Sequence, residues 1–295
     1  MNAKLVEDIA NAVLYEGYML YPYRQSAIKN QQRWNFGVLY PRAYCEAQTG
    51  SDAWSMQSEC LVYATGSVSA LTVRVRFLQL VKGTGQEREA SISCPDLREL
   101  SSSPARRTFT FPPGCEGTME AEAENLGNNR YKLRVRAWNT ASLDDADRAN
   151  RDKALLKSLV SAHIILHVEG GEFISLLDPP DELRELTAQC QNVSVWPVLV
   201  GEPESRDAML CSPIILYDYP QIAPESAGPL FDGTEIDEIL TLRIMTLTED
   251  EKLEIGQGDE RTRRILERTE ALPPEQLMKM HGALRGLRPA NRETP

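Results

Sequence analysis

The sequence predicts a mainly β (α+β) fold, in which an antiparallel β-sandwich-like body follows an N-terminal helix and precedes a helical C-terminal segment. Between residues 61 and 140, apolar and polar residues alternate with a period of two, which is typical of strands with one buried face. The strands expected there are not separated by crossover helices, so hairpin connections and antiparallel pairing are favoured. After residue 231 the apolar residues recur at helical spacing.

These changes of pattern divide the chain into three expected parts. Residues 1–60 hold an N-terminal helix and an aromatic-rich segment packed on the body, 61–230 form the β-rich body, and 231–295 form the helical C-terminal segment. The first helix is expected over residues 3–14. Leu5, Ile9, Ala12 and Val13 would form its apolar face, and Gly17 is a plausible stop.

The strands of the body differ in how clearly the sequence marks them. In 71–80, Leu71, Val73, Val75 and Phe77 share one face, while the other face is polar. The clearest hairpin joins Glu-rich and Arg/Lys-rich arms whose exposed side chains can pair across the strands. Its arms are 118–124 and 131–138, with a turn at 126–129. Further strands are expected at 108–111, 162–168, 172–177, 193–200 and 213–217.

Capping residues mark the helices of the C-terminal segment. Thr234 can cap a helix that carries Ile236, Ile239, Leu240 and Ile244. The run 248–251 has capping-box form, and further helices are expected over 259–270 and from Pro273 onward.

Composition restricts the function classes. The chain has 295 residues, a formal net charge of -11 and a pI near 5.0, which argues against broad nucleic-acid binding. No apolar run reaches the roughly 18 residues of a membrane span. The N-terminus lacks the apolar region of a signal peptide, so the expected location is the cytoplasm.

No catalytic motif is present, so the catalytic residues, if any, are unknown. The sequence predicts no metal and no cofactor, because it has only three histidines and its cysteines are scattered. Three alternatives stay open. His163 and His167 would be neighbours if they lay on a helix, and the acidic run 232–238 has oxygen ligands for Mg²⁺ or Ca²⁺. The six cysteines could also converge in space: Cys45, Cys60, Cys94, Cys115, Cys190 and Cys211.

The most unusual segment is aromatic and basic. Six of the ten tyrosines fall within the first 44 residues, in a stretch with four basic side chains on an otherwise acidic chain. Such residues dominate the energetic centres of protein interfaces. The predicted partner-binding residues are Tyr21, Tyr23, Arg24, Lys29, Arg33 and Trp34. The equally weighted alternative is that these aromatic side chains anchor an irregular segment onto the body.

At this segment the chain resembles uncharacterised bacterial proteins that are encoded within nickel–iron hydrogenase gene clusters. The resemblance begins with the runs 13–18 and 20–24, the second being Leu20-Tyr21-Pro22-Tyr23-Arg24, and continues through 26–27, 29–30, 33–34, 36–37, 54–60, 169–173 and 231–243. It implies a hydrogenase accessory or assembly protein whose partner is a hydrogenase subunit or maturation factor. The alternative is an enzyme of cofactor or subunit processing. The resemblance brings no catalytic residues with it.

Overall fold

The computed structural model describes residues 3–24, 26–31, 35–81, 84–222, 226, 228–232, 236–258 and 260–280. Contacts divide the chain into two compact units. The first comprises Met1–Glu16 and Trp34–Gln221, and the second comprises Gly17–Arg33 and Ile222–Pro295. The three-part division expected at residues 60 and 230 stays a prediction.

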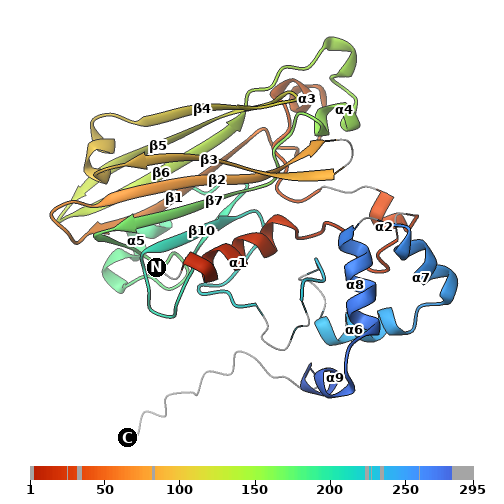
Figure 1. The fold of residues 1–295 in the computed structure, drawn as a ribbon. Helices are drawn as coiled ribbons and strands as arrows, with labels where there is room; N and C mark the ends of the chain where they lie inside the picture. Colours follow the sequence, from red (N-terminus) through yellow and green to blue (C-terminus); the bar gives the residue numbers. More distant parts are fainter. Residues whose placement is uncertain are drawn as a thin grey trace, which may run out of the picture. The chain divides into compact units, whose positions relative to one another are not determined.

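The described residues of the first unit form two antiparallel sheets of five strands each, as the sequence predicted (Figure 1). The first sheet has the order β4-β5-β6-β1-β8. Its strands are β1 (Ser55–Ala64), β4 (Ala105–Phe111), β5 (Cys115–Gly127), β6 (Arg130–Asn139) and β8 (Gly171–Phe173). The second sheet has the order β3-β2-β7-β10-β9. Its strands are β2 (Ala70–Val81), β3 (Thr84–Cys94), β7 (Val160–Glu169), β9 (Trp196–Leu199) and β10 (Ala208–Ser212).

The apolar core lies between the two sheets. Strand β2 contributes Val73, Val75 and Phe77, and β5 and β6 contribute Met119 and Val135 from the opposite sheet. The predicted alternation in β2 is confirmed, because its polar residues Thr72, Arg74 and Arg76 lie on the other face. The predicted hairpin is also confirmed. Asn128 and Asn129 join β5 to β6 with φ of 53° and 58°, as a two-residue turn with two positive φ angles requires.

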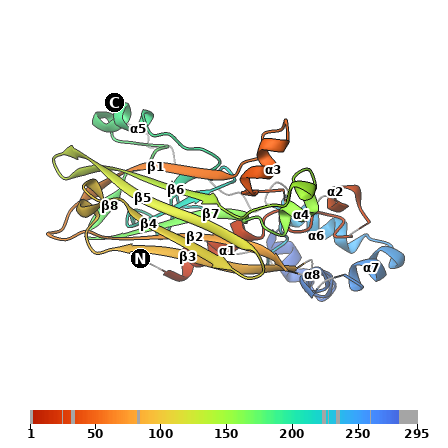
Figure 2. The same cartoon turned by 90° about the horizontal axis from the view of Figure 1, so that it is seen from above.

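Short helices surround the sheets of the first unit, and Figure 2 shows α5 beside β1. They are α1 (Ala3–Leu14), α3 (Arg42–Ala47), η1 (Leu97–Ser101), η2 (Asp145–Asp147), α4 (Arg151–Leu155), η3 (Asp181–Leu183) and α5 (Arg184–Ala188). The bounds of α1 match the prediction, and so does the burial of Ile9 and Val13, but Leu5 is only half-buried and Ala12 is exposed. The buried face is Val6, Ile9, Ala10 and Val13, which packs on β7, β9 and β10.

Ion pairs between Glu7 and two arginines of β2 hold the polar side of α1. Glu7 accepts hydrogen bonds from Arg74 at 2.5 Å and from Arg76 at 2.9 Å. Arg76 is buried and also donates to Asn11 at 2.8 Å. Glu7 thus ties α1 to β2 through ion pairs with two arginines.

The sequence prediction of a strand over 213–217 was wrong. Strand β10 ends at Ser212, where Pro213 has no N–H to continue the ladder. The Ser212 hydroxyl instead accepts from the N–H of Ile214 at 3.1 Å. The expected strands at 172–177 and 193–200 are likewise shorter, as β8 and β9.

The second unit is helical. Its elements are α2 (Ile28–Gln31), α6 (Asp237–Met245), α7 (Glu249–Gly256), α8 (Glu260–Glu270) and α9 (Pro274–Met280). The predicted capping box is confirmed, since Thr248 and Glu251 each satisfy the other's backbone N–H at the start of α7. The predicted cap at Thr234 lies outside the described residues. Buried Leu240, Ile244 and Ile265 lie on α6 and α8.

Candidate functional site

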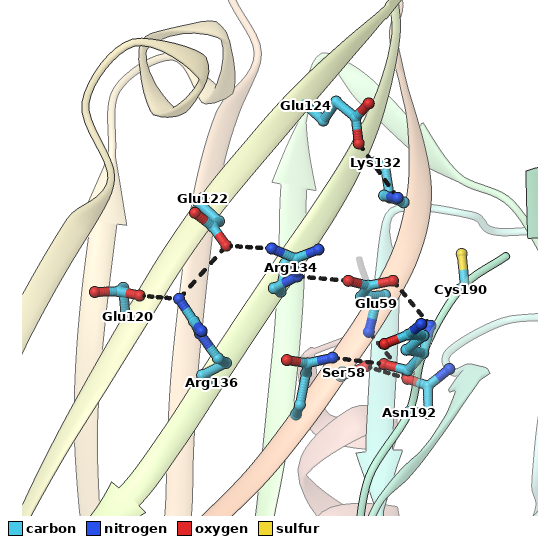
Figure 3. A network of polar contacts seen from close by, with 12 residues as sticks. Ser58, Glu59, Glu120, Glu122, Glu124, Lys132, Arg134, Arg136, Cys190 and Asn192 are labelled. Atoms are coloured by element: carbon cyan, nitrogen blue, oxygen red, sulfur yellow. Dashed lines mark hydrogen bonds and ion pairs between the residues drawn. The ribbon is translucent and has the colours of Figure 1, made fainter.

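An ion-pair network covers part of the outer face of the first sheet (Figure 3). It follows from the register of β5 and β6, which places three glutamates of β5 opposite basic residues of β6. The cross-strand pairs are Glu120–Arg136 at 2.6 Å, Glu122–Arg134 at 2.7 Å and Glu124–Lys132 at 3.2 Å. The predicted pairing of the two hairpin arms is therefore confirmed.

Glu59 of β1 extends this network into the interior, with a side chain only 1% exposed. Its carboxylate accepts hydrogen bonds from Arg134 and, at 2.8 Å, from the N–H of Gln191. Asn192 accepts from the N–H of Glu59 at 3.0 Å and from the Ser58 hydroxyl at 3.1 Å. Hydrogen bonds to Glu59 and Glu122 raise the pKa of Arg134. The network thus ties the 190–192 loop to the sheet.

The predicted partner-binding residues begin in the second unit. Tyr23 is 1% exposed, and its hydroxyl donates to the Leu230 carbonyl at 2.7 Å. Tyr21 meets Tyr23 edge-on with ring centroids 6.3 Å apart, and Arg243 lies 5.6 Å from the centre of the Tyr21 ring. Tyr23 is therefore part of the interior of this unit, while Tyr21 is only half-buried.

The other predicted residues differ in exposure. Arg24 pairs with Glu251 at 3.1 Å and with Glu254 at 3.8 Å. Hydrogen bonds from Thr248 are the largest cause of the lowered pKa of Glu251, and Arg24 adds to it. Lys29 is exposed on α2. Arg33 and Trp34 lie outside the described residues, and partner binding by the whole set stays a prediction.

Two further aromatic residues of this segment, Tyr40 and Tyr44, pack in the first unit. The rings of Tyr40 and Tyr44 are 4.7 Å apart, and Arg42 lies 4.9 Å from the centre of the Trp54 ring. Backbone hydrogen bonds hold them in place: the N–H of Tyr40 donates to the Ala53 carbonyl at 2.8 Å. The aromatic segment is thus shared between the two units.

The sequence did not reveal that three large apolar side chains of β9 and of the segment after β10 are exposed on the first unit; Trp196, Ile215 and Tyr217 are called the exposed apolar surface below. Their exposed fractions are 45%, 77% and 86%. The chain after β10 turns Ile214 and Leu216 inward, onto the cluster that includes α1, and turns Ile215 and Tyr217 outward. The alternation was visible in the sequence. Apolar residues on both faces, however, gave no sign that one face would stay uncovered.

A pocket of about 250 Å³ lies beside this surface and shares Trp196 with it. Asp52 and Tyr40 line it from the segment around α3, Ser194 from the loop before β9, and Pro213 from the end of β10. Gly37 fits this lining at a φ of +54°, where an added Cβ would lie 2.6 Å from Pro213. A second, more open hollow includes His167 and Asp207, whose side chains approach to 3.8 Å.

The cysteine thiols are held protonated at neutral pH. Burial raises the pKa of Cys45 and Cys190 to about 11 and of Cys115 and Cys211 to about 12. His163 is fully buried under α1, and burial lowers its pKa to about 4. Within the described ranges, no three His, Cys, Asp or Glu side chains come together as a metal site.

The chain matches no protein-family model and no curated protein. Among the helices that the structure describes, none has the length and apolar character to cross a bilayer. Function is therefore inferred from the residues and their geometry.

Proposed function

We propose that this chain is a non-enzymatic accessory protein of nickel–iron hydrogenase, which binds a hydrogenase subunit or its immature form through the exposed apolar surface of Trp196, Ile215 and Tyr217. The resemblance in the aromatic segment supports the identity of the partner. The exposed side chains support a binding role, and Tyr217 at 86% exposed carries the proposal.

Large apolar side chains gathered on one face mark interaction sites more often than scattered ones do. Tyrosine and tryptophan are also enriched among the residues that contribute most to binding. A partner that covered Trp196, Ile215 and Tyr217 would remove their apolar area from water, at roughly 25 cal/mol per Å² before the costs of association.

The backbone presents these side chains in an ordered way. Ile214 and Leu216 anchor the segment by packing against the apolar cluster that includes α1. At its far end the N–H of Tyr219 donates to the Leu199 carbonyl at 2.7 Å, and Asp218 accepts from the N–H of Leu199 at 2.8 Å. Because the segment is already fixed at both ends, binding would cost less conformational entropy than ordering a free loop.

The alternative proposal is an enzyme of cofactor or subunit processing. A carboxyl group that acts as a general acid at neutral pH needs a raised pKa. The carboxyl pKa shifts resolved among the described residues are all downward, at Asp96, Asp207, Glu251 and Glu254. We therefore favour the binding role, and leave Tyr21, Lys29, Arg33 and Trp34 as a second predicted contact region.

Co-purification from a host that carries the hydrogenase operon tests this proposal. The tagged wild-type chain is expected to retain a hydrogenase subunit, and Trp196→Ala with Tyr217→Ala is expected to lose it. The matched control is Val68→Ala with Leu177→Ala, which removes exposed apolar side chains elsewhere on the same unit. Equal retention by both double variants would show that the surface is not the binding site.

A further inference from the structure

We propose that the pocket between Asp52 and Trp196 binds a single cationic group, the ammonium or guanidinium of a lysine or arginine side chain that a protein partner presents. The nature of the partner as a protein depends on the proposed function above. The preference for positive charge depends only on the pocket itself.

The walls of the pocket are held by backbone hydrogen bonds. Leu39 and Leu159 exchange two bonds, at 2.9 and 3.1 Å, and Tyr40 donates to Ala53 next to Asp52. On the other side, Gln57 and Val193 exchange two bonds, at 3.0 and 2.9 Å, just before Ser194. The pocket therefore exists without a ligand and does not have to be ordered on binding.

Asp52 supplies a negative charge that the described part of the chain does not neutralise. No hydrogen bond or ion pair to its carboxylate exists there, and the side chain is exposed. The nearby cations are engaged elsewhere: Arg42 pairs with Glu46 at 2.7 Å, and Arg151 donates to Asn35 at 2.6 Å. A cationic side chain would give this carboxylate the partner that it lacks.

The negative charge of Asp52 affects the pKa of neighbouring side chains. Burial is the largest cause of the raised pKa of Tyr40, Tyr44 and Cys45, and the negative charge of Asp52 raises the pKa of each further. Arg151 lowers the pKa of both tyrosines, more strongly than Asp52 raises it at Tyr40 and less strongly at Tyr44. Of these two charged residues, only Asp52 lines the pocket. Asp52 is therefore the charged group that a side chain inserted into the pocket would contact directly.

Trp196 and the size of the pocket also suit a long cationic side chain. The half-exposed ring of Trp196 can lie against the methylene stem of a long side chain or face the cation itself. A volume of about 250 Å³ is below the roughly 300–1,000 Å³ typical of small-molecule sites. It is suited to one inserted side chain, and Ile215 and Tyr217 would contact its flanking residues.

The test titrates the full chain with three probes: Nα-acetyl-lysinamide, Nα-acetyl-argininamide and the neutral Nα-acetyl-norleucinamide. Binding is followed by the nuclear magnetic resonance signal of the Trp196 indole N–H, which the Trp196→Phe variant assigns. The cationic probes are expected to shift this signal, with the norleucine probe at least about tenfold weaker. Raising the salt from about 20 to about 200 mM should weaken the cationic probes alone.

Substitutions at two different carboxylates separate a specific effect of the pocket from a general loss of charge. Asp52→Asn is expected to weaken both cationic probes by about tenfold, while Asp178→Asn, at another exposed carboxylate of the same unit, leaves them unchanged. Equal binding of the norleucine probe, an unaffected Asp52→Asn variant, or no shift with either cationic probe would overturn the proposal. These titrations contain no hydrogenase component, so their failure would be distinct from a failure of co-purification.

Discussion

Glu59 and Arg134 form an ion pair across β1 and β6 in which the carboxylate is 1% exposed and the guanidinium is 36% exposed. The pair joins a buried charge to the surface network of the neighbouring hairpin, since Arg134 also binds Glu122. Loss of the buried Glu59–Arg134 pair should therefore destabilise the fold more than loss of a pair that lies at the surface.

We predict that Arg134→Met destabilises the protein by about 1.5–3 kcal/mol, because Glu59 would remain buried with only the N–H of Gln191 as a partner. The control is Arg136→Met on the same strand, where both charges reach the surface and a loss of at most about 1 kcal/mol is expected. Chemical denaturation measures both. Equal losses would show that the burial of Glu59 has no energetic consequence.

We predict that Tyr23→Phe destabilises the helical unit by about 0.5–1.5 kcal/mol, because the buried Leu230 carbonyl loses its donor. Tyr217→Phe removes the same hydroxyl from a side chain that is 86% exposed and should change stability little. Thermal or chemical unfolding compares the two. An unaffected Tyr23→Phe variant would return Tyr23 to the predicted contact residues.

His163 should make stability depend on pH. Burial, with Arg76 and Arg74 nearby, lowers its folded pKa to about 4 from about 6.5, so the unfolded chain binds the proton first as the pH falls. Stability is therefore fully retained above about pH 6.5. It declines between about 6.5 and 4, by up to about 3 kcal/mol. His163→Gln should show a shallower decline over this window, measured by denaturation at several pH values; an unchanged slope would contradict the assignment.

The predicted contact residues of the aromatic segment have their own test. Lys29→Ala with Trp34→Ala should weaken the complex with a hydrogenase subunit while leaving the melting temperature unchanged, because Lys29 is exposed. Arg24→Ala, which removes the pairs to Glu251 and Glu254, should cost at most about 1 kcal/mol of stability. A Lys29/Trp34 variant with a lowered melting temperature and unchanged binding would favour the structural role.

The sequence predicted those elements whose local pattern and final environment agree. Strand β2 has one apolar face and one polar face, and the 128–129 turn needs two residues that tolerate positive φ. Strand β3 was missed because it is an edge strand whose first half, around Gln86 and Glu89, is charged and exposed. Such a strand is defined by pairing with β2, which the local sequence does not encode.

The candidate sites were harder to predict. Asp52 and Trp196 are 144 positions apart along the chain and meet only because β1, β9 and the 35–53 segment converge. The aromatic and basic composition of the segment that holds Tyr23 and Arg24 was visible in the sequence. That composition is shared by interfaces and by interiors, so it could not separate a buried Tyr23 from an exposed Lys29.

Trp196 and Tyr217 are proposed to bind a hydrogenase subunit. Equilibrium titration of the purified chain against each purified hydrogenase subunit tests this proposal most directly. We predict saturable binding to one subunit, weakened by at least about 30-fold in the Trp196→Ala, Tyr217→Ala variant, which corresponds to about 2 kcal/mol at such positions. No binding to any subunit, or an unchanged Kd for the folded double variant, would contradict it.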